Sequence, residues 1–184
     1  MTPLGLKLSS QLTRKIVSYK AYEFINWNSR KAVDIPNISA ASGTKMIQYT
    51  KNGTNAQRFI AISTPTQYSS ESFYDMIYLS VYANIMLDVQ QPFWFWEDGN
   101  ANGRKLQTYS QDNNRYASYR SFYYNDNELK TANTGYTKSI HVENESYSDF
   151  ANLVQWGVGG GYNCKWDRNY VASYYFNFYL LGEL

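Results

Sequence analysis

The chain has 184 residues and a formal net charge of +2. That length suits one domain with a buried core, and the 17 basic residues are scattered rather than clustered, which argues against a nucleic-acid-binding surface. The single cysteine, Cys164, excludes an intrachain disulfide and a cysteine-based metal cluster, and the single histidine, His141, cannot form a histidine site alone. We therefore expect no metal and no cofactor.

The N-terminal segment, MTPLGLKLSSQLTRK, lacks the apolar core of a signal peptide. No apolar run elsewhere is long enough for a transmembrane helix. We expect residues 1–18 to be an extension or a first strand, and residues 19–184 to form a single domain. If the protein acts outside the cell, we expect it to leave by lysis, by a dedicated system or as part of a particle.

Short β-prone runs follow one another along the rest of the chain. They begin with KAVDI, KMIQYT and QRFIAI, continue with MIYLSVY, IMLDV and KLQTY, and end with YRSFYY, SIHV, LVQW and YYFNFYLL. Turn-forming clusters such as KNGTN, DGNANG and SQDNN separate them. No long window has clean helical periodicity, so the pattern predicts an all-β barrel or sandwich.

These runs repeat three times. An apolar-x-apolar block recurs with Asp34, Asp88 and His141 at its centre. Behind each block, one aromatic residue lies ten positions before a second one, in the pairs Tyr49 and Phe59, Tyr109 and Tyr119, and Trp156 and Trp166. One such unit cannot bury its apolar face alone. We therefore expect three repeats, at about 19–75, 76–129 and 130–184, to close a β-trefoil that leaves no free sheet edge.

The first repeat resembles one subdomain of the ricin-type β-trefoil lectins and family-13 carbohydrate-binding modules. The stretch RKAVDIPNISAASGTKMIQYTKNGTNAQRF contains an apolar-Asp-apolar block, a glycine turn, a strand ending beside an aromatic residue, and a variant of the motif Asn-Gln-x-Trp. The similarity covers about residues 20–180, and it is clearest in repeat one and weakest in repeat two. It implies twelve strands, three pseudo-symmetric repeats, and up to three shallow sugar sites.

The resemblance assigns a set of sugar-binding residues to each repeat. An aromatic ring covers the apolar face of a sugar, a carboxylate accepts hydrogen bonds from its hydroxyls, and an amide side chain both donates and accepts. The matching residues are Asp34, Tyr49, Asn55 and Gln57 in repeat one, Asp88, Gln107 and Tyr109 in repeat two, and Trp156 and Asn163 in repeat three.

Every repeat departs from the family pattern. In repeat one, Ala56 stands at the asparagine position beside Asn55, and the strand amide falls on Ile47, with Gln48 expected to point the other way. Tyr116 and Ala117 replace the Asn-Gln pair of repeat two, while His141 and Cys164 replace the carboxylate and the glutamine of repeat three.

Two groups of these residues also have a structural interpretation. Asp34 and Gln57 can hold their hairpin together by hydrogen bonds without touching a ligand. The second aromatic residues, Phe59, Tyr119 and Trp166, stand where the family has core aromatics, and we expect them to pack inside the barrel.

Repeat two also carries an insertion at residues 90–103, QQPFWFWEDGNANG. Four consecutive aromatics, Phe93, Trp94, Phe95 and Trp96, cannot all face one core from a strand, because side chains alternate. We expect them to cover a barrel end or to form an interface with a protein partner or a second copy.

Two functions therefore compete. The first is a non-catalytic, lectin-like module that binds glycans, of galactose or xylose type, through one or two of its three repeats. The alternative is a structural or particle-assembly subunit, of a toxin complex or a phage, with degenerate sugar sites. An enzyme is the weakest hypothesis, because no nucleophile or phosphate-binding motif occurs. We expect an extracellular or particle-associated protein with no nucleic-acid partner and no membrane span.

Overall fold

The computed structural model of the chain describes residues 12–65, 74–81, 85–92, 98–110, 117–159 and 161–181. Within these ranges it contains strands and short 3-10 helices. The strands are β1 (Leu12–Asn26), β2 (Ala32–Asp34), β3 (Ile47–Tyr49), β4 (Phe59–Pro65), β5 (Tyr74–Ser80), β6 (Ile85–Val89), β7 (Leu106–Ser110), β8 (Phe122–Asn125), β9 (Glu128–Thr131), β10 (Lys138–Val142), β11 (Leu153–Gly157) and β12 (Trp166–Leu181). None of the helices described is of a length and apolarity that would cross a membrane.

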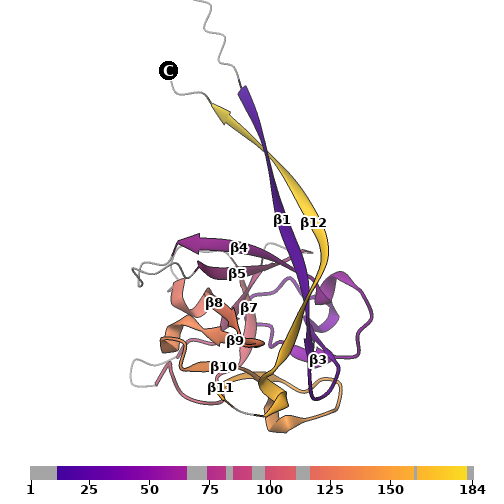
Figure 1. Cartoon of the computed structure of the whole chain (residues 1–184), viewed down its shortest axis with the longest axis vertical. Helices are drawn as coiled ribbons and strands as arrows, with labels where there is room; N and C mark the ends of the chain where they lie inside the picture. The colour runs from indigo at the N-terminus through magenta and orange to yellow at the C-terminus, as the bar shows by residue number, and fades with distance from the viewer. Residues whose placement is uncertain are drawn as a thin grey trace, which may run out of the picture.

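These twelve strands form the predicted β-trefoil, with four strands in each repeat (Figure 1). Around the barrel, β12 pairs with β1, β1 with β4, β4 with β5, β5 with β8, and β8 with β9. The remaining strands form three hairpins, β2–β3, β6–β7 and β10–β11. Strand β5 begins at Tyr74 and β9 at Glu128, close to the predicted repeat starts at 76 and 130.

The three hairpins are joined to one another in a ring, which we call the hairpin ring. Isolated bridges connect Lys45 to Gln107, Ile47 to Asn152, and Lys105 to Val154, so each hairpin touches the other two. At the centre of each contact lies one buried residue of the second hairpin strand: Gln48, Thr108 or Gln155. Each of these residues hydrogen-bonds the loop of the repeat before it, and repeat three stands before repeat one.

The barrel is filled by large side chains from all three repeats. Phe59 and Trp166 are buried, as predicted, and Trp166 donates its indole N–H to the carbonyl of Ile140 at 2.9 Å. Removing such aromatics from water supplies much of the folding free energy of a domain of this size. In repeat two, however, the fully buried aromatic at the start of β8 is Phe122.

Phe122, rather than Tyr119, therefore occupies the core position of repeat two. Tyr119 lies in the 3-10 turn Ala117–Arg120 that precedes β8, where it is half-buried against the core. The prediction was wrong because it assumed the same ten-residue spacing in every repeat, whereas thirteen residues separate Tyr109 from Phe122. The same shift in spacing affects the alignment of Ala117 with the Asn-Gln pair, and Tyr116 lies outside the described residues.

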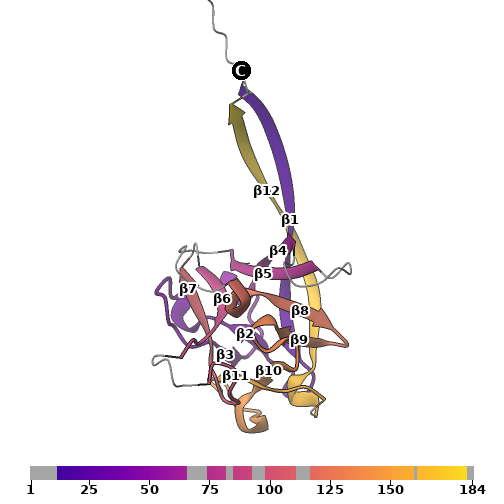
Figure 2. The same cartoon turned by 90° about the vertical axis from the view of Figure 1, so that its left-hand side faces the viewer.

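Strands β1 and β12 continue beyond the barrel as a long two-stranded ribbon, seen in both views (Figures 1 and 2). Their ladder runs from Asn26 opposite Trp166 to Leu12 opposite Leu181, with a β-bulge between Ala21 and Tyr22. Residues Ala21 and Tyr22 of β1 also pair with β4 in the barrel, and from Lys20 outward β1 and β12 form the ribbon. A two-stranded ribbon is marginally stable alone in water, so its register is fixed by the barrel at its base.

Candidate functional site

Two of the four predicted residues of repeat one, Asp34 and Tyr49, line an open pocket of about 250 Å³, which we call site one. Asp34 lies at the end of β2 and Tyr49 at the end of the neighbouring strand β3. Because side chains alternate along β3, Ile47 and Tyr49 face the pocket while Gln48 does not. The turn Pro36–Ile38 also lines the pocket. The apolar ring and the carboxylate of one predicted site thus border the same cavity.

Gln57 lies behind Asp34 and does not line the pocket. Its side chain is fully buried, and its amide donates to Oδ2 of Asp34 at 2.9 Å and to the carbonyl of Thr50 at 3.1 Å. Its Oε1 accepts the backbone N–H of Asn52 at 3.0 Å. Gln57 therefore fixes both the carboxylate and the turn that carries Asn52, so any effect on a ligand acts through them.

The carboxyl group of Asp34 is harder to ionise than that of an ordinary aspartate. Burial raises its pKa above the usual value, although the hydrogen bond from Gln57 lowers it and the charge of Asp149 raises it further. A carboxylate whose charge lacks full compensation is a good acceptor for two hydroxyl groups. Asp149 itself is satisfied, since the ammonium group of Lys31, at 2.6 Å, lowers its pKa.

Asn55 is exposed in the 3-10 turn Asn55–Gln57 and does not line site one. Asn52, from the Asn-Gly turn, lines the rim in its place. Its Oδ1 accepts from the backbone N–H and the hydroxyl of Thr54, at 3.0 and 2.8 Å. This residue was missed because the prediction followed the family motif, although the turn that carries it was visible in the sequence.

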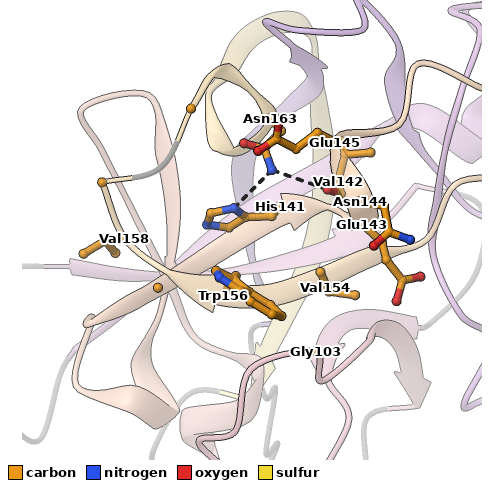
Figure 3. A pocket seen from close by; sticks show the side chains of 13 residues that line it. Gly103, His141, Val142, Glu143, Asn144, Glu145, Val154, Trp156, Val158 and Asn163 are labelled. Carbon is orange, nitrogen blue, oxygen red and sulfur yellow. Dashed lines mark hydrogen bonds between the residues drawn. The ribbon is translucent and has the colours of Figure 1, made fainter.

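Repeat three has a larger pocket, of about 540 Å³, which we call site three (Figure 3). Trp156 lies at its edge and is 49% exposed, so its ring is open to a ligand. His141 and Asn163 lie across from it, and the turn Glu143–Glu145 forms the rim. Gly103 approaches from the loop of repeat two.

His141 stands where repeat one has Asp34, but its ring is occupied by protein partners. Nε2 is 3.2 Å from the hydroxyl of Ser139, and Nδ1 is 3.4 Å from the amide of Asn163. Burial lowers the pKa of His141, and this outweighs the opposing effect of the Glu128 carboxylate, so the imidazole is neutral at neutral pH. Cys164 is buried, and its Sγ lies 3.0 Å from the carbonyl oxygen of Gly161 and 3.6 Å from Oε1 of Glu128.

Repeat two presents its predicted polar residues differently. Asp88 is fully buried, and its Oδ1 accepts from the side-chain amide of Gln107 at 3.0 Å. The two residues face each other across the β6–β7 ladder, so their hydrogen bond staples that hairpin. Tyr109 is half-buried at the end of β7. The aromatic run of Phe93, Trp94, Phe95 and Trp96 lies outside the described residues, and its role in an interface stays a prediction.

The residue types that bind metal ions are dispersed over the part of the chain that the structure describes. No group of three or more histidine, cysteine, aspartate or glutamate side chains there is placed to hold an ion. What sites one and three offer is an aromatic ring beside polar groups on an open surface, an arrangement suited to a ligand with an apolar face and a polar rim.

No protein-family model matches the chain, and no curated protein matches it. Among solved structures it is similar to the designed three-fold symmetric protein ThreeFoil, with 24% identity and a TM-score of 0.62 over 80% of this chain and 96% of that one. It is also similar to the C-half of the earthworm R-type lectin in complex with GalNAc, with 15% identity and a TM-score of 0.60 over 83% and 99%.

A third similar structure is the exo-β-1,3-galactanase 1,3Gal43A from Clostridium thermocellum. The identity is 21% and the TM-score 0.67, over 83% of this chain and 30% of the galactanase chain. Identities this low establish the fold alone. By its strand order and by these likenesses, the chain has the β-trefoil fold of the R-type and ricin B-like lectins.

Proposed function

We propose that this protein is a non-catalytic carbohydrate-binding module whose working sites are site one and site three. The observation that carries the proposal is the convergence of Asp34 and Tyr49 on one open pocket, with Gln57 holding the carboxylate in place. A ring and a carboxylate at a shared surface match the apolar face and the hydroxyl groups of a pyranose. Asp88, which is fully buried, makes repeat two the least suited of the three.

Site three supports the proposal through Trp156 and Asn163 rather than through a carboxylate. A half-exposed indole is a large stacking surface, whereas the neutral His141 supplies no charge-assisted hydrogen bond. We therefore propose that site three binds more weakly than site one, and that the two together bind branched or clustered glycans through avidity. We propose galactose-type sugars as the first ligands to test, because the earthworm lectin of the same fold was solved with GalNAc.

The test is a glycan array followed by calorimetry with the tightest ligand. Tyr49→Ala and Trp156→Ala are each expected to leave one working site, and the double variant is expected to bind nothing. Tyr170→Ala is the matched control, because it removes an exposed ring, 58% exposed, outside both pockets. If the wild-type chain retains no glycan, or if the double variant binds like the wild type, the proposal is wrong.

A second function, assembly into a larger particle, is favoured by the ribbon of β1 and β12. From Lys20 outward, β1 pairs within the described residues with β12 alone, and Tyr175 on the ribbon is 71% exposed. Exposed apolar rings on a projecting element mark contact surfaces. Light scattering after size exclusion tests this: an assembly that Tyr175→Lys disperses supports the function, and a monomer at every concentration contradicts it.

We also propose that residues 19–184 act as a single domain and that the protein works outside the cell or on a particle. The barrel core drawing on all three repeats supports the first part. The second part follows from the proposed ligand, since glycans are displayed mainly on outer surfaces.

A further inference from the structure

Three positions of the hairpin ring are equivalent in backbone but not in residue type. The backbone N–H groups of Phe150, Gly43 and Gly103 donate to the carbonyls of Gln48, Thr108 and Gln155, at 3.0, 2.6 and 2.9 Å respectively. All three donors have a positive φ, of 67°, 81° and 85°. Two of the repeats thus use glycine for this left-handed conformation, and repeat three uses a phenylalanine.

The phenylalanine is costly at this position. A positive φ brings the Cβ of a bulky residue too close to its own backbone, and glycine avoids that strain. A Cβ at Gly43 or Gly103 would meet no other atom within 4 Å. The difference between the repeats is therefore one of backbone strain and not of room, and strained residues of this kind collect at functional sites.

Packing in the core does not account for Phe150, because its side chain is 67% exposed. The ring lines site one and lies 5.1 Å from the ring of Tyr49, centroid to centroid, at an angle of 64°. The loop that carries it is held firmly against repeat one. Gln48 donates to the carbonyls of Ser146 and Ser148, both at 2.8 Å, and Asp149 accepts the backbone N–H of Thr50 at 2.8 Å.

We propose that Phe150 is a specificity-determining residue of site one, supplied by repeat three as a second aromatic wall; this inference rests on the proposed function. The rings of Phe150 and Tyr49 form a corner beside Asp34. A pyranose that stacks one face on Tyr49 meets Phe150 with its edge or with an apolar substituent, while Asp34 accepts from its hydroxyls. Site one is then completed by two repeats and selects glycans that present apolar surface on two adjoining sides.

The experiment compares Phe150→Gly with Phe150→Ala by calorimetry with the array ligand, in a Trp156→Ala background that isolates site one. Both variants lose the ring, so both are expected to lose affinity about two- to tenfold. Only glycine also relieves the backbone, so Phe150→Gly is expected to unfold about 2–4 °C above Phe150→Ala. Tyr147→Ala, which removes a 65% exposed ring from the same loop outside the pocket, is expected to bind like its parent.

The outcomes separate this inference from the proposed function. If Asp34→Ala abolishes binding while both Phe150 variants keep the parent affinity, the ring of Phe150 does not contact the ligand. That result overturns this inference alone. If the variants lower the melting temperature strongly and leave the affinity per folded molecule unchanged, the ring serves packing, and the inference is again overturned. A wild-type chain that binds no glycan overturns the proposed function, and the inference with it.

Discussion

Sites one and three share a backbone turn but hold different polar groups at their centre. The turns Pro36–Ile38 and Glu143–Glu145 match closely, and the middle residue of each, Asn37 or Asn144, has a φ of 54°. Asp34 and His141, the equivalent central groups, differ in chemistry, although burial disfavours the charged form of both, because it raises the pKa of the carboxyl group and lowers the pKa of the imidazole. The fold therefore preserves the shape of a site even where its chemistry has changed.

The largest difference in binding between sites one and three is expected when the residues behind their central groups, Gln57 and Cys164, are replaced. Gln57→Ala removes the donor to Asp34 and leaves a buried carboxylate unpaired, which we expect to lower the free energy of unfolding by roughly 1–3 kcal/mol and to abolish binding at site one. Cys164→Ala is the matched change in repeat three, where the thiol donates to the carbonyl of Gly161 at 3.0 Å and to Oε1 of Glu128 at 3.6 Å, so site three should keep its affinity. Urea unfolding and calorimetry measure both; equal losses of binding in the two sites would refute the comparison.

The second-largest effect on binding is expected from removing the negative charge of Asp34. Asp34→Asn keeps an oxygen for Gln57 but removes the negative charge, so we expect binding at site one to weaken about tenfold. Because the folded-state pKa of Asp34 is raised, its ionisation destabilises the protein as the pH rises through that pKa. The variant should therefore be more stable than the wild type at neutral pH, and this advantage should shrink toward pH 3.8, the ordinary pKa of an aspartate. A variant less stable than the wild type at pH 7 would contradict this.

A smaller gain is expected when repeat three is given the groups of repeat one. The double change His141→Asp with Cys164→Gln restores a carboxylate and its donor beside Trp156, and we expect site three to bind about fivefold tighter, the effect of one charge-assisted hydrogen bond. His141→Asp alone buries an acid without that donor and should lower the melting temperature. Calorimetry in a Tyr49→Ala background reads site three alone, and no gain in the double variant would show that the carboxylate is not what distinguishes the sites.

The smallest effect concerns pH. Burial holds the pKa of His141 in the folded state below the ordinary histidine value of 6.5, so the stability that the neutral ring provides is present above that value and is lost as the pH falls through the folded-state pKa. His141→Gln should flatten the decline in melting temperature that begins below about pH 6.5. A decline of unchanged steepness in the variant would assign it to other groups.

The sequence predicts those site residues that belong to a single repeat. Asp34, Tyr49 and Gln57 lie within one short hairpin unit, so their spacing already places them together. Phe150 and Gly103 reach their pockets from the neighbouring repeat, and no spacing within a repeat reveals that contact. Phe122 was missed because a longer loop shifts the register of repeat two. The ribbon was missed because it depends on pairing between residues at opposite ends of the chain.

The hairpin ring has a consequence for how the molecule opens. Since Gln48, Thr108 and Gln155 each hold the loop of the preceding repeat, the three contacts form a cycle in which none can be released first without loosening the next. The backbone N–H groups of Gln48, Thr108 and Gln155 should therefore be protected from hydrogen exchange to a similar degree. Weakening any one of the three contacts should reduce the protection of all three N–H groups together. Sites one and three border this cycle, so if they bind sugars as proposed, a sugar held at one repeat should slow exchange at the other two.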